Sequence, residues 1–371
     1  MILTDLQYID GNYEIRPGAI RINNGVITSF QDNGEKDEMS MGGLLALPGL
    51  IDIHTHGGSG ADACDKTKEA YKTLSKHYAR HGVTSFCPTT MTLPISQLKE
   101  IFEAIESYKG QEPAAYIQGI NMEGPYVSKN KCGAQNPDYI VPPDAEEFLE
   151  LSKISKVCLV DVAPESPGAF DFAEKVSSTY VCSIAHTDAD YDTAKEAITH
   201  GFSHVTHFYN AMSGLSHRAP GVVGAVFEDS TVTAELICDG FHLSPAAVRI
   251  AFKVLGADRC VAISDSLSSA DFPDGEYMLG GQKVIVKGGH AHLENGTIAG
   301  STANLFDEFR NLLSFGIDFK TALKACSENP ARVIGAFDRC GSLEEGKNAD
   351  IIFVDNEMNL KHVFVKGKMI F

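Results

Sequence analysis

The sequence of 371 residues predicts an α/β fold, a (β/α)8 barrel of the TIM type with a small β-sandwich domain built from the N- and C-terminal segments. From residue 49 to about 336, short apolar runs alternate with helical patterns, which is typical of parallel βα units. Eight such runs can be counted, and eight strands close a barrel. Both ends of the chain read as strands. We therefore expect residues 1–47 and 338–371 to form the small domain and residues 48–337 the barrel.

In the terminal segments, apolar and polar residues alternate, which is typical of β-strands. An Asn-Gly pair at residues 24–25 separates two alternating runs, which predicts a β-hairpin. Neither terminal segment is large enough to bury a core alone, so we expect the two to pair. The predicted strands cover residues 2–5, 18–22, 26–30, 349–354 and 362–371.

The barrel strands are predicted from apolar, β-favouring runs bounded by turn residues. They cover residues 50–56, 83–88, 116–123, 157–162, 180–186, 204–207, 232–238 and 259–264. Helices between them include residues 66–80, 95–108, 191–200 and 246–255, the last introduced by Ser244 as cap and Pro245 in the first turn. An alternating, glycine-rich insertion at 274–301 predicts a β-hairpin over the barrel mouth, and helices return at 303–313, 319–326 and 331–336.

Composition and charge exclude several classes of partner. The net charge of -18 repels the phosphates of nucleic acids and of anionic membranes, although a few well-placed cations could still bind a small anion. No apolar run approaches the roughly 18 residues of a membrane span, and no signal peptide is visible. The nine cysteines are scattered singly, which indicates a reducing compartment and predicts a cytoplasmic protein.

The first barrel strand carries a His-x-His pair. Side chains alternate along a strand, so His54 and His56 project from the same face, close enough to share a metal ion at the strand's C-terminal end. Taken alone the pair is a weak signal, because satisfied core or surface histidines give the same pattern. The remaining histidines, among them His77, His81 and His204, are interpreted mostly as surface or helix-end residues.

Further metal-ligand residue types occur at the ends of other predicted strands, where barrel enzymes place their catalytic groups. Together with the first strand they make a set of four imidazoles and two carboxylates. The set consists of His54 and His56, Glu123 after strand three, His186 after strand five, His207 after strand six and Asp265 after strand eight. Such a set predicts a hydrolytic site with one or two metal ions, which activate water and polarise a carbonyl.

Several motifs in series resemble the amidohydrolase superfamily and, more closely, the N-acetylglucosamine-6-phosphate deacetylase family. The resemblance covers the chain from about residue 45 to its end. The motifs are NMEGPY at 121–126, GAQNP at 133–137, AHT at 185–187, THFYNAM at 206–212, DGFH at 239–242, ISD at 263–265, LGG at 279–281 and AGS at 299–301.

The resemblance implies a deacetylase that releases acetate from a phosphorylated amino sugar and is a homodimer. By the same resemblance, Glu123, His186 and His207 bind the catalytic metal, and Asp265 is the general base. His242 is implied to contact the substrate near the reacting amide. Residues implied to hold the sugar and its phosphate are Asn210, Ala211 and Arg218. Gln135 stands where some members have histidine; it can bind substrate but cannot become an imidazolium.

The retained His54 and His56 pair favours two metal ions per chain. Glu123, His186 and His207 with a water already complete a tetrahedral site, so the strand-one pair needs an ion of its own, to which Asp265 could bind. Zinc is favoured, and iron(II) or manganese would suit the same ligands.

Alternatives to this function stay open at this point. The substrate could be the galacto epimer, N-acetylgalactosamine-6-phosphate, or another small amide. A cyclic-amide hydrolase is disfavoured, because residues 157–165 on strand four contain no lysine to bridge two metals. A catalytically inactive barrel that serves as a scaffold is disfavoured too. Inactive barrels lose metal ligands, whereas all six predicted ligand residues are present here.

Overall fold

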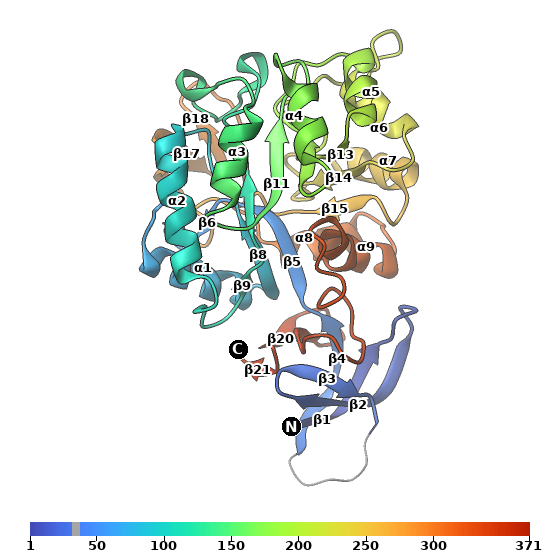
Figure 1. Ribbon diagram of the computed structural model, residues 1–371. Helices are drawn as coiled ribbons and strands as arrows, with labels where there is room; N and C mark the ends of the chain where they lie inside the picture. The colour runs from blue at the N-terminus through green and yellow to red at the C-terminus, as the bar shows by residue number, and fades with distance from the viewer. Residues whose placement is uncertain (32–37) are drawn as a thin grey trace.

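The computed structural model describes residues 1–31 and 38–371 and confirms the predicted barrel with a terminal β domain. Figure 1 shows the barrel above and the small sheet domain below, with both chain termini beside the sheet domain. Residues 32–37 of the predicted small domain lie outside the described part of the chain. The domain boundaries at 47/48 and 337/338 stay a prediction.

Parallel strands form the barrel. They are β5 (Leu50–Thr55), β8 (Val83–Pro88), β9 (Tyr116–Ile117) with β10 (Ile120–Met122), β11 (Val157–Val162), β12 (Val181–Ile184), β13 (Phe202–Val205), β14 (Thr233–Leu236) and β15 (Cys260–Ala262). Neighbours along this order pair in parallel, and a parallel bridge between Thr89 and Asn121 joins β8 to the β10 strand. The ring closes where the Asp265 N–H donates to the His54 carbonyl at 3.0 Å.

A helix follows each barrel strand, as expected for βα units. These helices are α1 (Lys68–Arg80), α2 (Ile95–Tyr108), α3 (Ala145–Ser152), α4 (Ala169–Val176), α5 (Tyr191–Thr199), α6 (Gly221–Glu228) and α7 (Pro245–Leu255), followed by α8 (Leu305–Ser314), α9 (Phe319–Cys326) and α10 (Glu328–Val333). The predicted cap is confirmed, because the Ser244 hydroxyl accepts a hydrogen bond from the Ala247 N–H at 3.3 Å. Short 3-10 turns at Lys129–Lys131 and Pro137–Tyr139 shape the loop after β10.

The insertion after β15 differs from its prediction. Three antiparallel strands replace the expected hairpin: β16 (Gly275–Leu279), β17 (Gln282–Lys287) and β18 (His290–Leu293). The second Gly-Gly pair, at residues 288–289, makes a further turn with positive φ at both glycines. A two-stranded ribbon, β6 (Gly57–Gly58) and β7 (Ala61–Asp62), also extends beyond β5.

Strands from both ends of the chain form one seven-stranded sheet in the order β21-β20-β19-β4-β1-β2-β3. Their bounds are β1 Ile2–Ile9, β2 Ile15–Asn23, β3 Val26–Ser29, β4 Glu38–Pro48, β19 Ile351–Val354, β20 Leu360–Val365 and β21 Lys368–Met369. The sheet folds over, because the Ile27 N–H on edge strand β3 donates to the Lys347 carbonyl, close before β19, at 2.9 Å. The two layers enclose a core that both termini share, as the sequence predicts.

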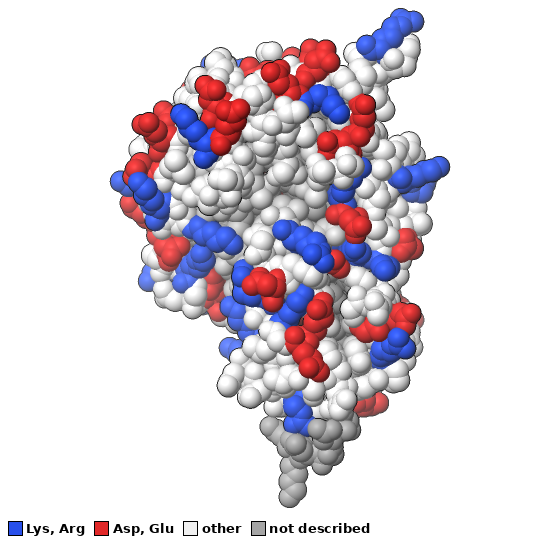
Figure 2. Space-filling view, turned by 45° about the vertical axis from the view of Figure 1, so that its right-hand side comes forward, with Lys and Arg blue, Asp and Glu red and all other residues white. Residues whose placement is uncertain are grey.

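The surface is a mixture of both charges on the face that Figure 2 shows, with lysines and arginines interspersed among aspartates and glutamates. No continuous basic patch of the kind that follows a nucleic-acid backbone covers that face. None of the helices in residues 1–31 and 38–371 has the length and apolarity that crossing a membrane requires.

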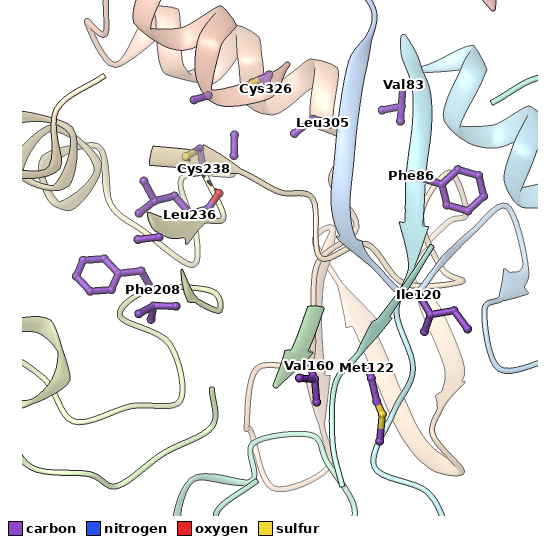
Figure 3. Packing of buried hydrophobic residues seen from close by; sticks show 14 of the residues in the cluster. Val83, Phe86, Ile120, Met122, Val160, Phe208, Leu236, Cys238, Leu305 and Cys326 are labelled. Atoms are coloured by element: carbon purple, nitrogen blue, oxygen red, sulfur yellow. Dashed lines mark hydrogen bonds between the residues drawn. The ribbon is translucent and has the colours of Figure 1, made fainter. Parts of the chain in front are cut away.

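The barrel core is a continuous set of apolar side chains contributed by the strands and the surrounding helices. Figure 3 shows Phe86 and Val83 on β8 and Val160 on β11 among its members, together with Leu305 at the start of α8. This packing fixes the strand ends in place, and the functional groups described below project from those ends.

We expect Phe353→Ala to lower the free energy of unfolding by roughly 3–5 kcal/mol, the cost of truncating a buried phenylalanine. Phe353 is fully buried on β19, and its ring centroid lies 5.6 Å from that of Phe364. Urea unfolding followed by circular dichroism measures the effect. Phe371→Ala is the matched control, because Phe371 is 52% exposed and its loss should cost about 0.5 kcal/mol or less. Equal unfolding midpoints for the two variants would contradict the shared terminal core.

Candidate active site

A cavity of about 370 Å³ opens at the C-terminal ends of the barrel strands. Its size is in the range of small-molecule sites. Part of its wall comes from the insertion, through Leu279, Thr297, Ile298 and Gly300, so the predicted position of the insertion over the barrel mouth agrees with the structure. Most of the metal ligands predicted at the ends of the barrel strands, a prediction called here the strand-end rule, also line the cavity: His56, Glu123, His186, His207 and Asp265.

Three of these residues leave their strands in a left-handed backbone conformation. The φ angles are 41° at His186, 30° at His207 and 49° at Asp265, which is uncommon for residues other than glycine. Such strain persists where surrounding structure holds it, and it concentrates at functional sites. β13 ends two residues earlier than predicted, because the His207 N–H donates to the side chain of Glu235 on β14, at 3.1 Å, and not to the backbone of that strand.

Glu123, His186 and His207 form the first ligand group. Glu123 Oε1 lies 3.0 Å from His186 Nε2 and 3.2 Å from His207 Nε2, and the two Nε2 atoms are 3.0 Å apart. Both rings have Nδ1 next to a backbone carbonyl, Lys131 O at 2.9 Å and Asn210 O at 3.2 Å. Because a carbonyl can only accept, each Nδ1 donates to its carbonyl, and both Nε2 atoms point toward the same place.

His54, His56 and Asp265 form the second group. His56 Nε2 lies 3.2 Å from both Asp265 Oδ1 and Glu123 Oε2, and His54 Nε2 lies 3.6 Å from Asp265 Oδ1 and from Glu123 Oε1. Glu123 therefore contacts both groups and lies between them. The pair on β5 projects into the site from one strand face, as its spacing predicts.

Neighbouring charges and hydrogen bonds outweigh the effect of burial on the pKa values of these groups. Burial alone would lower the pKa of His56, but Asp265 and Glu123 outweigh it and raise that pKa to about 10. For His54 the charges of Glu235 and Glu123 likewise overcome burial, so that its pKa is well above the ordinary value. Burial opposes ionisation of Glu123, yet the charge of His54 and hydrogen bonds from neighbouring histidines hold its pKa well below the usual range. The centre therefore favours positive charge between its carboxylates.

A buried carboxylate behind the site was not predicted from the sequence. Glu235 on β14 is fully buried; its Oε2 accepts from His54 Nδ1 at 2.9 Å, and its Oε1 lies 3.2 Å from His204 Nε2. His204 is itself fully buried, so interpreting it as a surface or helix-end residue was wrong. Asp161 on β11 is buried too and accepts from Thr206 Oγ1 at 2.8 Å. A carboxylate inside an apolar barrel strand was the available signal, because charged residues are rarely buried unless they are paired.

Most residues proposed to bind substrate line the cavity as well: Gln135, Asn210, Ala211 and His242 do, whereas Arg218 lies outside the lining on an exposed loop. The two ends of the Gln135 amide contact protein atoms, since Nε2 donates to Glu123 at 2.7 Å and Oε1 accepts from the Thr92 N–H at 2.6 Å. His242 Nδ1 bonds to Asp239 at 2.7 Å, which leaves Nε2 as its nitrogen available to a substrate. Lys131 lines the cavity although its position in the sequence gave no signal.

The two ligand groups fit divalent metal ions. His54 Nε2 is buried, has no hydrogen-bond partner and faces the carboxylates, and its Nδ1 is occupied by Glu235, so Nε2 is the nitrogen that could bind an ion. Ligands about 2.0–2.1 Å from a tetrahedral ion lie roughly 3.3–3.4 Å apart, which is close to the 3.0–3.2 Å separations of the first group. In metal centres, a carboxylate often accepts a hydrogen bond from the ring nitrogen of a histidine that does not face the metal, as Glu235 does from His54 Nδ1.

Comparisons with known proteins agree with this geometry. The amidohydrolase family profile matches residues 45–370. An N-acetylglucosamine-6-phosphate deacetylase of Bacillus subtilis (strain 168) is 33% identical over 384 residues, covering 100% of this chain and 97% of that protein. An N-acetylgalactosamine-6-phosphate deacetylase of Escherichia coli O157:H7 is 32% identical, covering 99% of this chain and 97% of that protein. The crystal structure of N-acetyl-D-glucosamine-6-phosphate deacetylase from Mycobacterium smegmatis superposes with a TM-score of 0.92 at 30% identity and covers both chains fully.

A barrel with paired histidine and carboxylate ligand groups at its strand ends defines a hydrolase with a metal-binding centre. The chain belongs to the amidohydrolase family. It is similar over its full length, at 30% identity and above, to sugar-phosphate deacetylases. The chain is therefore a hydrolase that acts on an amide C–N bond.

Proposed function

We propose that this chain hydrolyses the acetamide of N-acetylglucosamine-6-phosphate to glucosamine-6-phosphate and acetate. The observation that carries the proposal is the cluster of inward-facing Nε2 atoms around Glu123 in a cavity of a size that suits a sugar phosphate. Relatives at 33% and 35% identity, from Bacillus subtilis and Lysinibacillus sphaericus, carry this activity in their names.

The proposed cofactor is a pair of divalent ions per chain, with zinc favoured and iron(II) or manganese as alternatives. Glu123, His186 and His207 would hold one ion, and His54, His56 and Asp265 the other, with Glu123 placed to contact both. Ions at these positions would act as Lewis acids toward the acetamide carbonyl and make water a better nucleophile at neutral pH. Support comes from the two ligand groups, which meet at Glu123, and from the unpartnered His54 Nε2.

Asp265 is the proposed general base. Its carboxylate lines the cavity, and its pKa is lowered because bonds to His56 and the charge of His54 outweigh the effect of burial, so it is ionised and able to accept a proton. In this role it takes a proton from water as the water oxygen bonds to the acetamide carbon. It then delivers that proton to the amine nitrogen as the C–N bond breaks. His242, oriented by Asp239, is placed to contact the reacting amide.

The substrate's identity is tested with a panel of N-acetylated hexosamines, monitored by acetate release. We expect the highest kcat/KM for N-acetylglucosamine-6-phosphate and a lower value for its unphosphorylated form. The galacto epimer is the rival substrate, because one curated relative at 32% identity is named for it. A higher kcat/KM for that epimer would reassign the substrate and leave the hydrolytic site standing, whereas no acetate from any member would reject the proposal.

Arg218→Ala should raise KM for the phosphorylated sugar far more than for the unphosphorylated sugar. A guanidinium is suited to grip a phosphate, and Arg218 lies on the exposed loop that follows Asn210 and Ala211 at the cavity wall. Steady-state kinetics on both sugars give the measurement. Arg310→Ala, which removes an exposed arginine on α8, is the matched control and should change neither KM. Equal KM changes for the two sugars in Arg218→Ala would remove Arg218 from the site.

The double change His54→Asn, His56→Asn should lower the metal content from about two ions per chain to about one. The first group keeps all three of its ligands in this variant, so partial activity should remain. Metal analysis by mass spectrometry, together with acetate release, checks both statements. One equivalent in the fully active wild type, unchanged in the double variant, would refute the two-ion proposal and leave the deacetylase proposal intact.

We also propose a cytoplasmic homodimer. All nine cysteines are free, and seven of them are buried, which suits a reducing compartment. The loop that carries Arg218 exposes Leu215 at 56%, an apolar side chain that a second subunit could cover. Light scattering on the purified protein tests the dimer, and a monomer at micromolar concentration would contradict it.

A further inference from the structure

A second cluster of metal-ligand side chains lies outside the cavity. His77 and His81 occupy the last turn and the C-cap of α1, and Asp271 lies in the segment that follows β15. Asp271 Oδ2 is 3.0 Å from His77 Nδ1 and 3.0 Å from His81 Nε2, and Ser59 Oγ lies 3.0 Å from His77 Nδ1 and 3.2 Å from Asp271 Oδ2. None of these four residues lines the cavity or belongs to the two groups around Glu123.

The spacing and distances suit a small divalent ion. Residues four apart on a helix face the same side, and a His pair at this spacing is a recurrent zinc-binding arrangement. The separations of 3.0–3.2 Å among the nitrogen and oxygen atoms are close to the roughly 3.3–3.4 Å edge of a tetrahedral zinc site. Two imidazoles and a carboxylate supply three ligands, and the Ser59 hydroxyl or a water is positioned to be the fourth.

The cluster is preorganised but open to solvent. The His77 ring packs on Gly58, where an added Cβ would come within 2.2 Å of the ring, so the imidazole is fixed against the β6–β7 ribbon. The side chain of His77 is 1% exposed, while those of His81 and Asp271 are 21% and 32% exposed, which gives an ion access from water.

Its position connects the cluster to the catalytic segments. Ser59 follows His56 by three residues, and Asp271 follows Asp265 by six. The two segments already bond to each other, since the Ser59 N–H donates to Ala270 O at 2.9 Å and the Gly60 N–H to Ser268 O at 2.7 Å. An ion here would fasten both of them to α1.

We propose that His77, His81 and Asp271 form an additional divalent-cation site of the zinc type, separate from the active site, that fastens the segments after β5 and β15 to helix α1. The proposal does not rest on the deacetylase function. With two side chains partly exposed and one position open, the ion at this site exchanges with solvent more readily than ions held at the buried centre.

Zinc content of the wild type, His81→Gln and Asp271→Asn proteins tests the proposal. Each protein is stripped with a chelator, reloaded with zinc, freed of excess ion, and analysed by mass spectrometry. We expect both variants to hold about one equivalent less than the wild type, whatever the number at the active site, and to melt at lower temperature only when zinc is present. Acetate release should fall by less than about threefold, because the buried ligand groups are unchanged.

His200→Gln is the matched control. His200 also caps a helix C-terminus and bonds to an acidic side chain, Glu174 at 2.7 Å, but lacks a second histidine, so its loss should leave the zinc content unchanged. Anomalous diffraction from zinc-loaded wild-type crystals gives a measurement that does not depend on any variant: we expect a peak in contact with His77 Nδ1 and His81 Nε2. Zinc content equal to wild type in both variants, or no peak there, would overturn the proposal and show a hydrogen-bonded cluster only.

Discussion

Replacing Asp265 with asparagine is expected to lower kcat for acetate release by roughly 10²-fold or more, the usual contribution of a positioned proton acceptor. Asparagine keeps the shape of the side chain but cannot take a proton from water or return it to the leaving amine. The left-handed backbone at Asp265, with φ of 49°, is one that asparagine adopts more readily than most residues, so the fold should survive. Steady-state kinetics and a circular dichroism melt measure the two effects separately.

Asp271→Asn is the natural comparison, because it makes the same chemical change six residues further along, outside the cavity. Its kcat should stay within about threefold of wild type. If Asp265→Asn also retained activity within about threefold of wild type, Asp265 could not be the general base.

Glu123→Gln is expected to abolish activity by removing metal from the site. The Glu123 carboxylate contacts His56, His186 and His207, and its negative charge offsets the positive charge of whatever the site holds. Replacing a residue that hydrogen-bonds to a metal ligand typically lowers metal affinity roughly 10–100-fold. Loss of Glu123, which contacts both ligand groups, should lower it more. Metal analysis after dialysis should show a larger loss of metal than Asp265→Asn does, with no measurable acetate release.

Glu308→Gln controls for the effect of burying an amide in place of a carboxyl. Glu308 is fully buried on α8, and burial raises its pKa well above the ordinary value, which favours the neutral acid that glutamine imitates. That variant should retain its metal and most of its activity. Full metal content in Glu123→Gln would show that Glu123 is not a ligand.

The strand-end rule explains why much of the site could be predicted from the sequence. A histidine or carboxylate directly after an apolar run must project near the barrel mouth once the run becomes a barrel strand, and this brought His186 and Glu123 together across 63 positions. The barrel itself could be predicted because strand and helix patterns alternate over most of the chain. The terminal sheet could be predicted from the shortage of core-forming residues at each end.

Residues that act through others could not be predicted in the same way. Glu235 contacts His54 from 181 positions away, and a strand buried on both faces gives no periodicity to tell which side chains point inward. The same limit hid the contact of Asp271 with His77, 194 positions apart. The path of the exposed loop around Arg218 is not fixed by any local pattern, so its place outside the cavity lining followed only from the structure.

Incubation of the metal-loaded protein with N-acetylglucosamine-6-phosphate in ¹⁸O-labelled water tests the central claim most directly. Hydrolysis at this site predicts acetate and free amine in a one-to-one ratio, with one labelled oxygen atom in each acetate, as detected by mass spectrometry. Absence of acetate from the metal-loaded wild type, or acetate without the label, would contradict hydrolysis of the acetamide at this site.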